Sequence, residues 1–75
     1  MSKLTIITSK EMGTILKRLE FVEIRQTGSH KFFSRRDGRN TVIPMHNKDL
    51  KRGLIKAILK DIGISDEEYE AIRKN

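Results

Sequence analysis

The chain has 75 residues, enough for one small folded domain and too few for two, so we expect a single domain over residues 1–75. Sixteen lysines and arginines against ten acidic residues give a formal net charge of +6, and this excess on so short a chain predicts a polyanionic partner. The absence of cysteine excludes disulfides, thiol chemistry and cysteine-based zinc sites. It also agrees with a reducing compartment, so we expect a cytoplasmic protein.

Membrane insertion and secretion are not expected. The sequence contains no run approaching the roughly 20 apolar residues that span a bilayer. It also lacks the hydrophobic stretch of about 7 to 15 residues and the small-residue cleavage site of a secretory signal. We therefore expect no membrane partner and a mature chain that begins at or near Met1.

The first element expected along the chain is a helix over residues 9–20. Thr8 and Glu11 have the spacing of a capping box at its start, and Ser9 is the alternative N-cap. The apolar residues of this segment recur at the spacing of a helix lying on a core: Met12, Ile15, Leu16 and Leu19.

Three strands are expected next, over residues 21–26, 30–36 and 39–43. The first alternates apolar and polar side chains and is followed by a turn around Gly28. The second and third flank Asp-Gly at residues 37–38, a pair typical of hairpin turns. Pro44 cannot donate to a sheet ladder, so it ends the third strand or lies at an edge.

A second amphipathic helix follows, begun by Asp49 or Asn47 and ended by Gly63. Its apolar positions are Leu50, Leu54, Ile55, Ile58, Leu59 and Ile62.

The last expected element is a short C-terminal helix, because Ser65 and Glu68 form another capping-box pattern ahead of Tyr69 and Ile72. The whole order is α-β-β-β-α with this additional helix, an α+β fold. We expect two helices on one face of a three-stranded antiparallel sheet, with the other face open to water.

The positive charge is concentrated in the middle of the chain. Residues 61–75 instead carry five acidic against two basic side chains, so we expect the last segment to lie away from a polyanion. For any single lysine or arginine, the alternative is that it only solvates the surface. Residues 25–60 contain ten basic side chains against Asp37 and Asp49, namely Arg25, Lys31, Arg35, Arg36, Arg39, Lys48, Lys51, Arg52, Lys56 and Lys60.

Two histidines are available for acid–base chemistry. His30 opens the second expected strand after Gly28 and Ser29, where the glycine permits a close approach of phosphate to the main chain. His46 follows Pro44, and an ordinary hairpin register predicts both histidines at one end of the hairpin. From the residues alone, a turn glycine with a surface histidine, and a His46 that only caps a loop, stay open. Two imidazoles and scattered carboxylates do not make a zinc site, so we expect no metal and no cofactor.

A family resemblance rests on five pieces in order. They are Gly-Ser-His at residues 28–30, the Asp-Gly hairpin, Val-Ile-Pro-Met-His at 42–46, Leu-Lys-Arg-Gly at 50–53, and Ile-Leu-Lys-Asp-Ile-Gly-Ile-Ser at 58–65 with Glu-Glu-Tyr at 67–69. Over roughly residues 8–70 the sequence resembles the HicA toxins, small mRNA interferases of type II toxin–antitoxin pairs. One departure is Leu54, where many relatives have threonine.

The resemblance implies a fold similar to a double-stranded-RNA-binding domain, metal-independent cleavage of mRNA and neutralisation by a cognate HicB-like antitoxin. In the family the histidine of Gly-Ser-His is catalytic, and this role carries over to His30. His46 matches the family pattern without an assigned role. The residues that we expect to bind RNA are Gly28, Ser29, Lys31, Arg35, Arg39, His46, Lys48, Lys51 and Arg52.

The chemistry suits a small enzyme, because RNA supplies its own nucleophile, the 2′-hydroxyl, and the protein needs one positioned base. If His30 faces the open side of the sheet, strand alternation places Phe32 and Ser34 on the same side and Phe33 under the helices. Phe32 then either stacks on a base or belongs to the core or its rim. Two other classes of function stay open: a non-catalytic module that binds double-stranded RNA, and a protein-binding domain whose basic surface docks an acidic partner.

Overall fold

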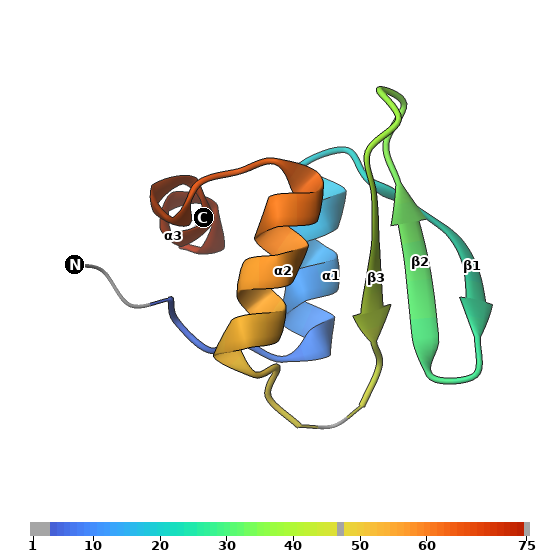
Figure 1. Ribbon diagram of the computed structural model, residues 1–75, viewed down its shortest axis with the longest axis horizontal. Helices are drawn as coiled ribbons and strands as arrows, with labels where there is room; N and C mark the ends of the chain where they lie inside the picture. The colour runs from blue at the N-terminus through green and yellow to red at the C-terminus, as the bar shows by residue number, and fades with distance from the viewer. Residues whose placement is uncertain (1–3, 47, 75) are drawn as a thin grey trace.

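The computed structural model describes residues 4–46 and 48–74. Three strands form one antiparallel sheet in the order β1-β2-β3, and the helices α1 and α2 lie beside it (Figure 1). Helix α3 lies on the side of these helices away from the sheet. None of the described helices has both the length and the apolar composition needed to cross a bilayer. In chain order the elements are α1 (Ser9–Arg18), β1 (Val22–Thr27), β2 (His30–Ser34), β3 (Asn40–Pro44), α2 (Arg52–Ile62) and α3 (Asp66–Arg73).

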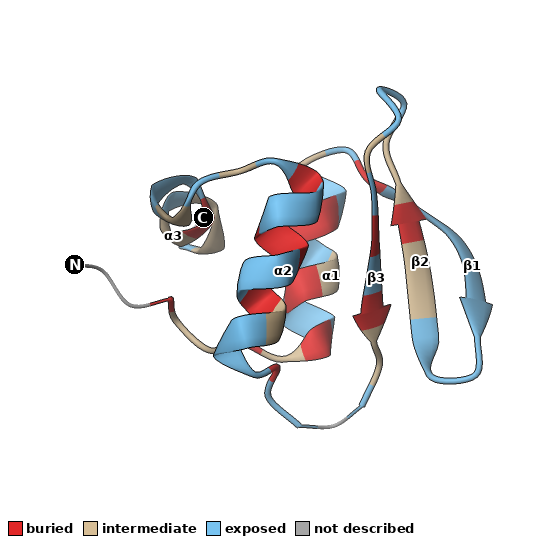
Figure 2. Ribbon diagram, in the orientation of Figure 1, coloured by how far each residue is buried: buried red, intermediate tan, exposed pale blue. Residues whose placement is uncertain are grey.

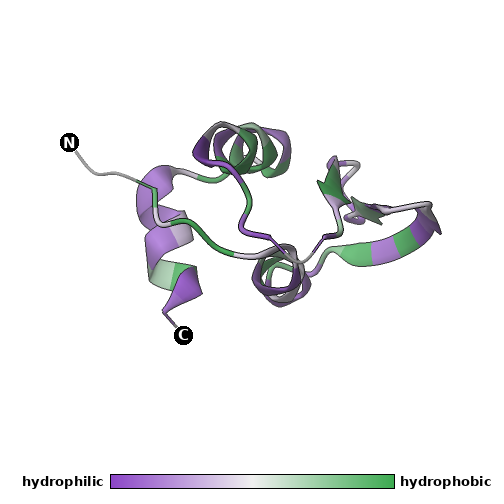
Figure 3. Cartoon of the chain, turned by 90° about the horizontal axis from the view of Figure 1, so that it is seen from below, coloured by the Kyte–Doolittle hydropathy of each residue, from purple (hydrophilic) through white to green (hydrophobic). Residues whose placement is uncertain are grey.

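One face of the sheet meets the helices, as predicted. Phe33 of β2 and Thr41 and Ile43 of β3 point to this side and are buried, because strand alternation places every second side chain there. Strand β1 has no buried residue and extends beyond the helices (Figure 2). Its apolar and charged residues alternate along this exposed length (Figure 3). The outer part of the sheet is therefore open to solvent.

Local capping determines where α1 and α3 begin. Both halves of the predicted capping boxes are present, Thr8 with Glu11 and Ser65 with Glu68. Ser9, the alternative cap, is instead buried, and its hydroxyl donates to the carbonyl of Pro44 at 2.6 Å. This bond attaches the start of α1 to the end of β3.

The predicted α1 was two residues too long. Its last helical residue is Arg18, and Glu20 adopts a left-handed conformation with φ of 71°. The N–H of Phe21 then returns to the carbonyl of Leu16 at 2.9 Å, which closes the end of the helix. The chain leaves in a new direction and enters β1 at Val22.

The prediction that Asp49 or Asn47 begins α2 was wrong for Asp49, and Asn47 lies outside the described residues. The N-cap is Lys51, which makes no side-chain capping bond. Asp49 pairs with Thr8 in an isolated β-bridge, and this pairing carries the chain two residues further before the helix can start. The other end agrees with the prediction, since Gly63 is left-handed with φ of 74°.

Strand β2 ends two residues earlier than predicted, at Ser34, and β3 lies one residue later than predicted, over Asn40–Pro44. The N–H of Arg35 donates to the carbonyl of Arg39 at 2.9 Å, so residues 36–38 form a three-residue loop. Gly38 occupies its left-handed position with φ of 97°. Pro44 pairs with His30 at the end of β3, an edge strand, where no ladder donor is lost.

Helix α3 holds the segment that precedes α1. The hydroxyl of Tyr69 donates to the carbonyl of Thr5, and the Thr5 N–H donates to the Glu70 carboxylate at 2.9 Å. This N–H bond, followed by the Arg73 side chain, holds the pKa of Glu70 below its usual range. Leu4 and Ile7 are buried in the same region, so the N-terminal segment completes the core.

Candidate functional site

The candidate site lies at the end of the sheet where β2 begins and β3 finishes, at the bottom of Figure 1. His30 pairs with Thr27 on one side and with Pro44 on the other. The N–H of Met45 donates to the carbonyl of Ser29, so the chain that carries His46 continues alongside the Gly-Ser-His turn. The register therefore brings both histidines to one end, as expected.

The β1–β2 turn exposes His30 and its neighbouring main chain. Gly28 and Ser29 form the two-residue loop, and Gly28 has a φ of 57°, a conformation that side-chain-bearing residues rarely adopt. No atom lies within 4 Å of the position that a Gly28 Cβ would occupy. The imidazole of His30 is exposed on the open face of the sheet, which it shares with Phe32. A ligand can therefore reach the ring and the backbone of the turn together.

His46 is exposed and oriented by its own loop. Its Nδ1 accepts the N–H of Lys48 at 3.2 Å. This bond selects the neutral tautomer with the proton on Nε2, because an acceptor nitrogen carries no hydrogen. In this arrangement His46 presents a hydrogen-bond donor to solvent and also caps the loop.

The same end carries cations from the β3–α2 loop. Lys48 and Lys51 are exposed, whereas Arg52 uses its Nε to donate to the carbonyl of Leu4 at 3.1 Å. Helix α2 begins here without a capping side chain and without an acidic residue in its first turn. Its free N–H groups and its dipole add to the positive potential of the lysines.

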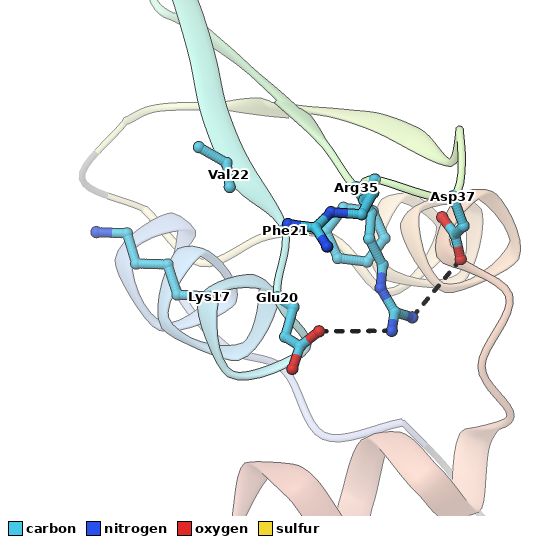
Figure 4. A pocket seen from close by; sticks show the side chains of 7 residues that line it. Lys17, Glu20, Phe21, Val22, Arg35 and Asp37 are labelled. Atoms are coloured by element: carbon cyan, nitrogen blue, oxygen red, sulfur yellow. Dashed lines mark ion pairs between the residues drawn. The ribbon is translucent and has the colours of Figure 1, made fainter.

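The structure does not bring Arg35 and Arg39 to His30. Arg35 lies five residues further along β2, about 16 Å away at the usual rise of a strand. It faces Glu20 at 3.8 Å and Asp37 at 3.7 Å (Figure 4). Both arginines were expected among the RNA-binding residues, and the structure places them at the end of β2 away from His30.

The guanidinium of Arg39 has two structural partners. It pairs with Asp37 at 2.6 Å and donates to the carbonyl of Ile62 at the end of α2. The hydrogen bond from Arg39 holds the pKa of Asp37 below its usual range and raises the pKa of Arg39 itself. Lys31 faces the helix side of the sheet, 3.4 Å from Glu23.

The hollow in Figure 4 belongs to this opposite end. It has a volume of about 610 Å³ and contains neither histidine. Its arginine and carboxylate pairs tie the β2–β3 hairpin to the end of α1. Its lining residues are Lys17, Glu20, Phe21, Val22, Arg35, Arg36 and Asp37.

Two lysines of α1 were not among the predicted RNA-binding residues. Lys10 and Lys17 line a groove of about 260 Å³ together with Lys31 of β2. Together with Thr14 they have the i, i+4, i+7 spacing that places residues on one helix face. This spacing was the sequence pattern from which a basic helix face could have been predicted. Charge counting over residues 25–60 missed them because they precede that window.

Metal ligands do not gather at this end. Within residues 4–46 and 48–74, no group of three or more histidine and carboxylate side chains is placed to hold an ion. The arrangement instead offers two exposed imidazoles, those of His30 and His46, together with exposed lysines and free main-chain N–H groups.

The architecture defines the class of protein first. An antiparallel sheet of three strands with α1 and α2 on one face, in the order α-β-β-β-α, is a double-stranded-RNA-binding-domain-like fold of the α+β class. The family model described as the HicA toxin of bacterial toxin–antitoxin systems matches residues 9–64. The chain belongs to the HicA toxin family. No curated protein matches the chain.

The matched range contains both histidines and every element of the sheet, and it ends just after Gly63. Membership in the family implies a toxin role and a cognate antitoxin as partner. Helix α3 and the segment before α1 lie outside the matched range.

Proposed function

We propose that the protein is a metal-independent endoribonuclease that blocks translation by cutting mRNA, with His30 as the general base. The observation that carries this proposal is the exposed His30 ring beside the open main chain of Gly28, at the end of the molecule where Lys48 and Lys51 are exposed. Family membership supports the same assignment, because His30 stands in the Gly-Ser-His pattern.

In the proposed reaction His30 accepts the proton of a ribose 2′-hydroxyl. The 2′-oxygen forms a bond to the adjacent phosphorus, and the bond from phosphorus to the 5′-oxygen breaks. The 5′-oxygen takes a proton from water as it leaves, and His30 returns the proton that it accepted to water, so the products are a 2′,3′-cyclic phosphate and a 5′-hydroxyl. One positioned base contributes about a hundred- to ten-thousandfold in rate.

The remaining residues of this end bind the phosphates in the proposal. The main chain of Gly28 and Ser29 approaches the scissile phosphate, and the Nε2–H of His46 donates to a phosphate oxygen. Lys48, Lys51 and the free N–H groups of α2 offset the charge that builds up in the transition state. Arg35 and Arg39 have no part in this step, because they lie at the opposite end of β2.

Purified wild-type and His30→Ala proteins test the proposal. We expect the wild type to cleave single-stranded RNA in the presence of EDTA and to leave 5′-hydroxyl ends. The variant should lose at least a hundredfold in rate and keep its RNA affinity. A matched His46→Gln variant should be impaired mainly in binding. Fragments with 5′-phosphate ends, or loss of all cleavage in EDTA, would count against the proposal.

The same experiment distinguishes the proposed nuclease from the alternative, a non-catalytic module that binds double-stranded RNA. The fold and the basic end suit such a module equally well. It would show no cleavage by the wild type and little effect of His30→Ala on affinity.

A further inference from the structure

We propose that the open sheet face beside His30 is a nucleobase subsite, in which a base next to the scissile phosphate stacks on the guanidinium of Arg25. This inference rests on the proposed function and adds to it that the substrate is single-stranded at the cut. Arg25 is held in place for this role by the ring of Phe32.

Phe32 and Arg25 lie close to His30. Phe32 lies two residues after His30 on the same face of β2, about 7 Å along the strand. Val42 is its partner on β3, and Arg25 is its partner on β1. A base whose sugar is attached to a phosphate at His30 is therefore within reach of this platform.

A β-bulge in β1 brings Arg25 opposite Phe32. Glu23 pairs with Phe33, so a regular ladder would place Ile24 opposite Phe32. The register shifts between Glu23 and Arg25, and Arg25 takes this place instead. Its guanidinium carbon lies 4.4 Å from the centroid of the Phe32 ring. Bulges often occur beside functional sites, where they change the direction of a side chain, and this one puts a cation on an aromatic ring.

The surface around Phe32 is a hollow with apolar walls and a few polar groups. A hollow of about 460 Å³ lies here, with Ile24, Phe32 and Val42 among its apolar walls. Asn40 also lines it, and the oxygen of its amide suits the edge of a base. Asp61 of α2 reaches the same hollow, where its Oδ2 accepts the hydroxyl of Thr41 at 3.1 Å. Apolar walls, a planar platform and a few polar groups are the usual components of a site for an unpaired base.

Charge favours a nucleotide over a protein segment on this face. Among the residues that the structure describes, Arg25 forms no ion pair. Its side chain is exposed, so the guanidinium plane turned away from Phe32 is open to a planar, electron-rich group. A nucleotide supplies that plane together with a negative charge, beside the end that carries His30 and the lysines.

Oligonucleotides with and without one base test the subsite. After the cut has been mapped, an abasic nucleotide replaces the residue on each side of it in turn, and kcat/KM is measured for each substrate. Stacking of a base on an aromatic side chain contributes about 1–3 kcal/mol, and arginine adds to such platforms. We therefore expect the wild type to lose about fivefold or more on one of the two abasic substrates.

Arg25→Lys keeps the charge and removes the plane, so it should cleave the intact substrate about as poorly as the wild type cleaves the abasic one. It should show little further loss on the abasic substrate. Arg36→Lys at the far hairpin is the matched control and should behave like the wild type. Phe32→Leu, which keeps an apolar side chain but removes the ring under Arg25, should resemble Arg25→Lys, with folding checked by thermal unfolding.

Equal cleavage of intact and abasic substrates by the wild type would overturn the subsite, as would wild-type selectivity in Arg25→Lys. Either result would indicate that this face binds a protein partner rather than a nucleobase. The affinity of the non-cleaving His30→Ala protein for oligonucleotides in which an abasic nucleotide replaces each position in turn gives the comparison without catalysis and without a mapped cut. The subsite is therefore tested even if the wild type shows no nuclease activity, a result that would contradict only the proposed function.

Discussion

Tyr69 shows how one residue connects the end of the chain to its beginning. The side chain is fully buried, and its hydroxyl donates to the carbonyl of Thr5. Burial, with a smaller contribution from Glu70, raises the pKa of Tyr69 to about 12. The phenol therefore stays protonated in the folded state at pH values where it would ionise in the unfolded chain.

This pKa shift predicts an alkaline loss of stability. Because the folded pKa is above the usual value of 10.0, the stabilising contribution is complete below pH 10 and is lost as pH rises towards 12. Tyr69→Phe should flatten this part of the pH profile. At neutral pH it should lower the free energy of unfolding by about 1 kcal/mol, since the Thr5 carbonyl loses its donor.

Urea unfolding of both proteins between pH 9 and about pH 12 measures the difference between their profiles, in which the shared titration of lysines cancels. Parallel profiles would contradict the role assigned to Tyr69. A Tyr69→Phe protein that is as stable as the wild type at neutral pH would show that the Thr5 bond contributes little.

The N-cap position of helix α2 affects both the stability of the helix and the binding of RNA. Its N-cap position is occupied by Lys51, whose side chain cannot accept a hydrogen bond from the first turn. The helix starts there because the β-bridge of Asp49 to Thr8 fixes the preceding chain. A lysine at this position leaves main-chain N–H groups free at the cationic end.

A cap at this position should stabilise the helix and weaken binding. Lys51→Ser supplies an acceptor for the first turn, so we expect the free energy of unfolding to rise by about 1 kcal/mol. RNA affinity should fall because a cation is lost and the free N–H groups are occupied. Lys51→Gln, which removes the charge without a good cap, should lose affinity without the gain in stability. Unchanged affinity in both variants would remove Lys51 from the proposed RNA surface.

The whole molecule separates its charges. Both α1 and α2 begin at the end that carries His30, His46 and the loop lysines (Figure 1). The acidic first turn of α3, residues 66–68, lies on the other side of the helices from the sheet. A polyanion is therefore attracted to one end and repelled from α3.

The salt dependence of RNA affinity should reveal this separation of charge. For single-stranded RNA the logarithm of the affinity falls with the logarithm of salt concentration by about 0.7 per phosphate contact. In a His30→Ala background, replacing Lys48 and Lys51 by glutamine should reduce the slope by about 1.4. Replacing Lys60 and Lys74 by glutamine removes the same charge elsewhere and should leave the slope nearly unchanged. Equal slopes for the two double variants would mean that binding is not localised.

Local patterns were sufficient for most elements. Both capping boxes and the stop at Gly63 depend on residues within a few positions of one another, and such interactions form in the same way wherever the segment lies. Alternation along β2 also put Phe32 on the same face as His30. The sequence by itself therefore determined the α+β fold, the order of its elements and which residues of β2 share a face.

Only the tertiary structure decided which distant residues meet. The strand register and the length of β2 separate Arg35 and Arg39 from His30 and give them partners at the hairpin. The bridge of Thr8 to Asp49 moves the start of α2 to Lys51, and the bulge in β1 puts Arg25 over Phe32. These pairings depend on how far each strand extends and on which segments pack together. Neither can be determined from the spacing of residues along the chain.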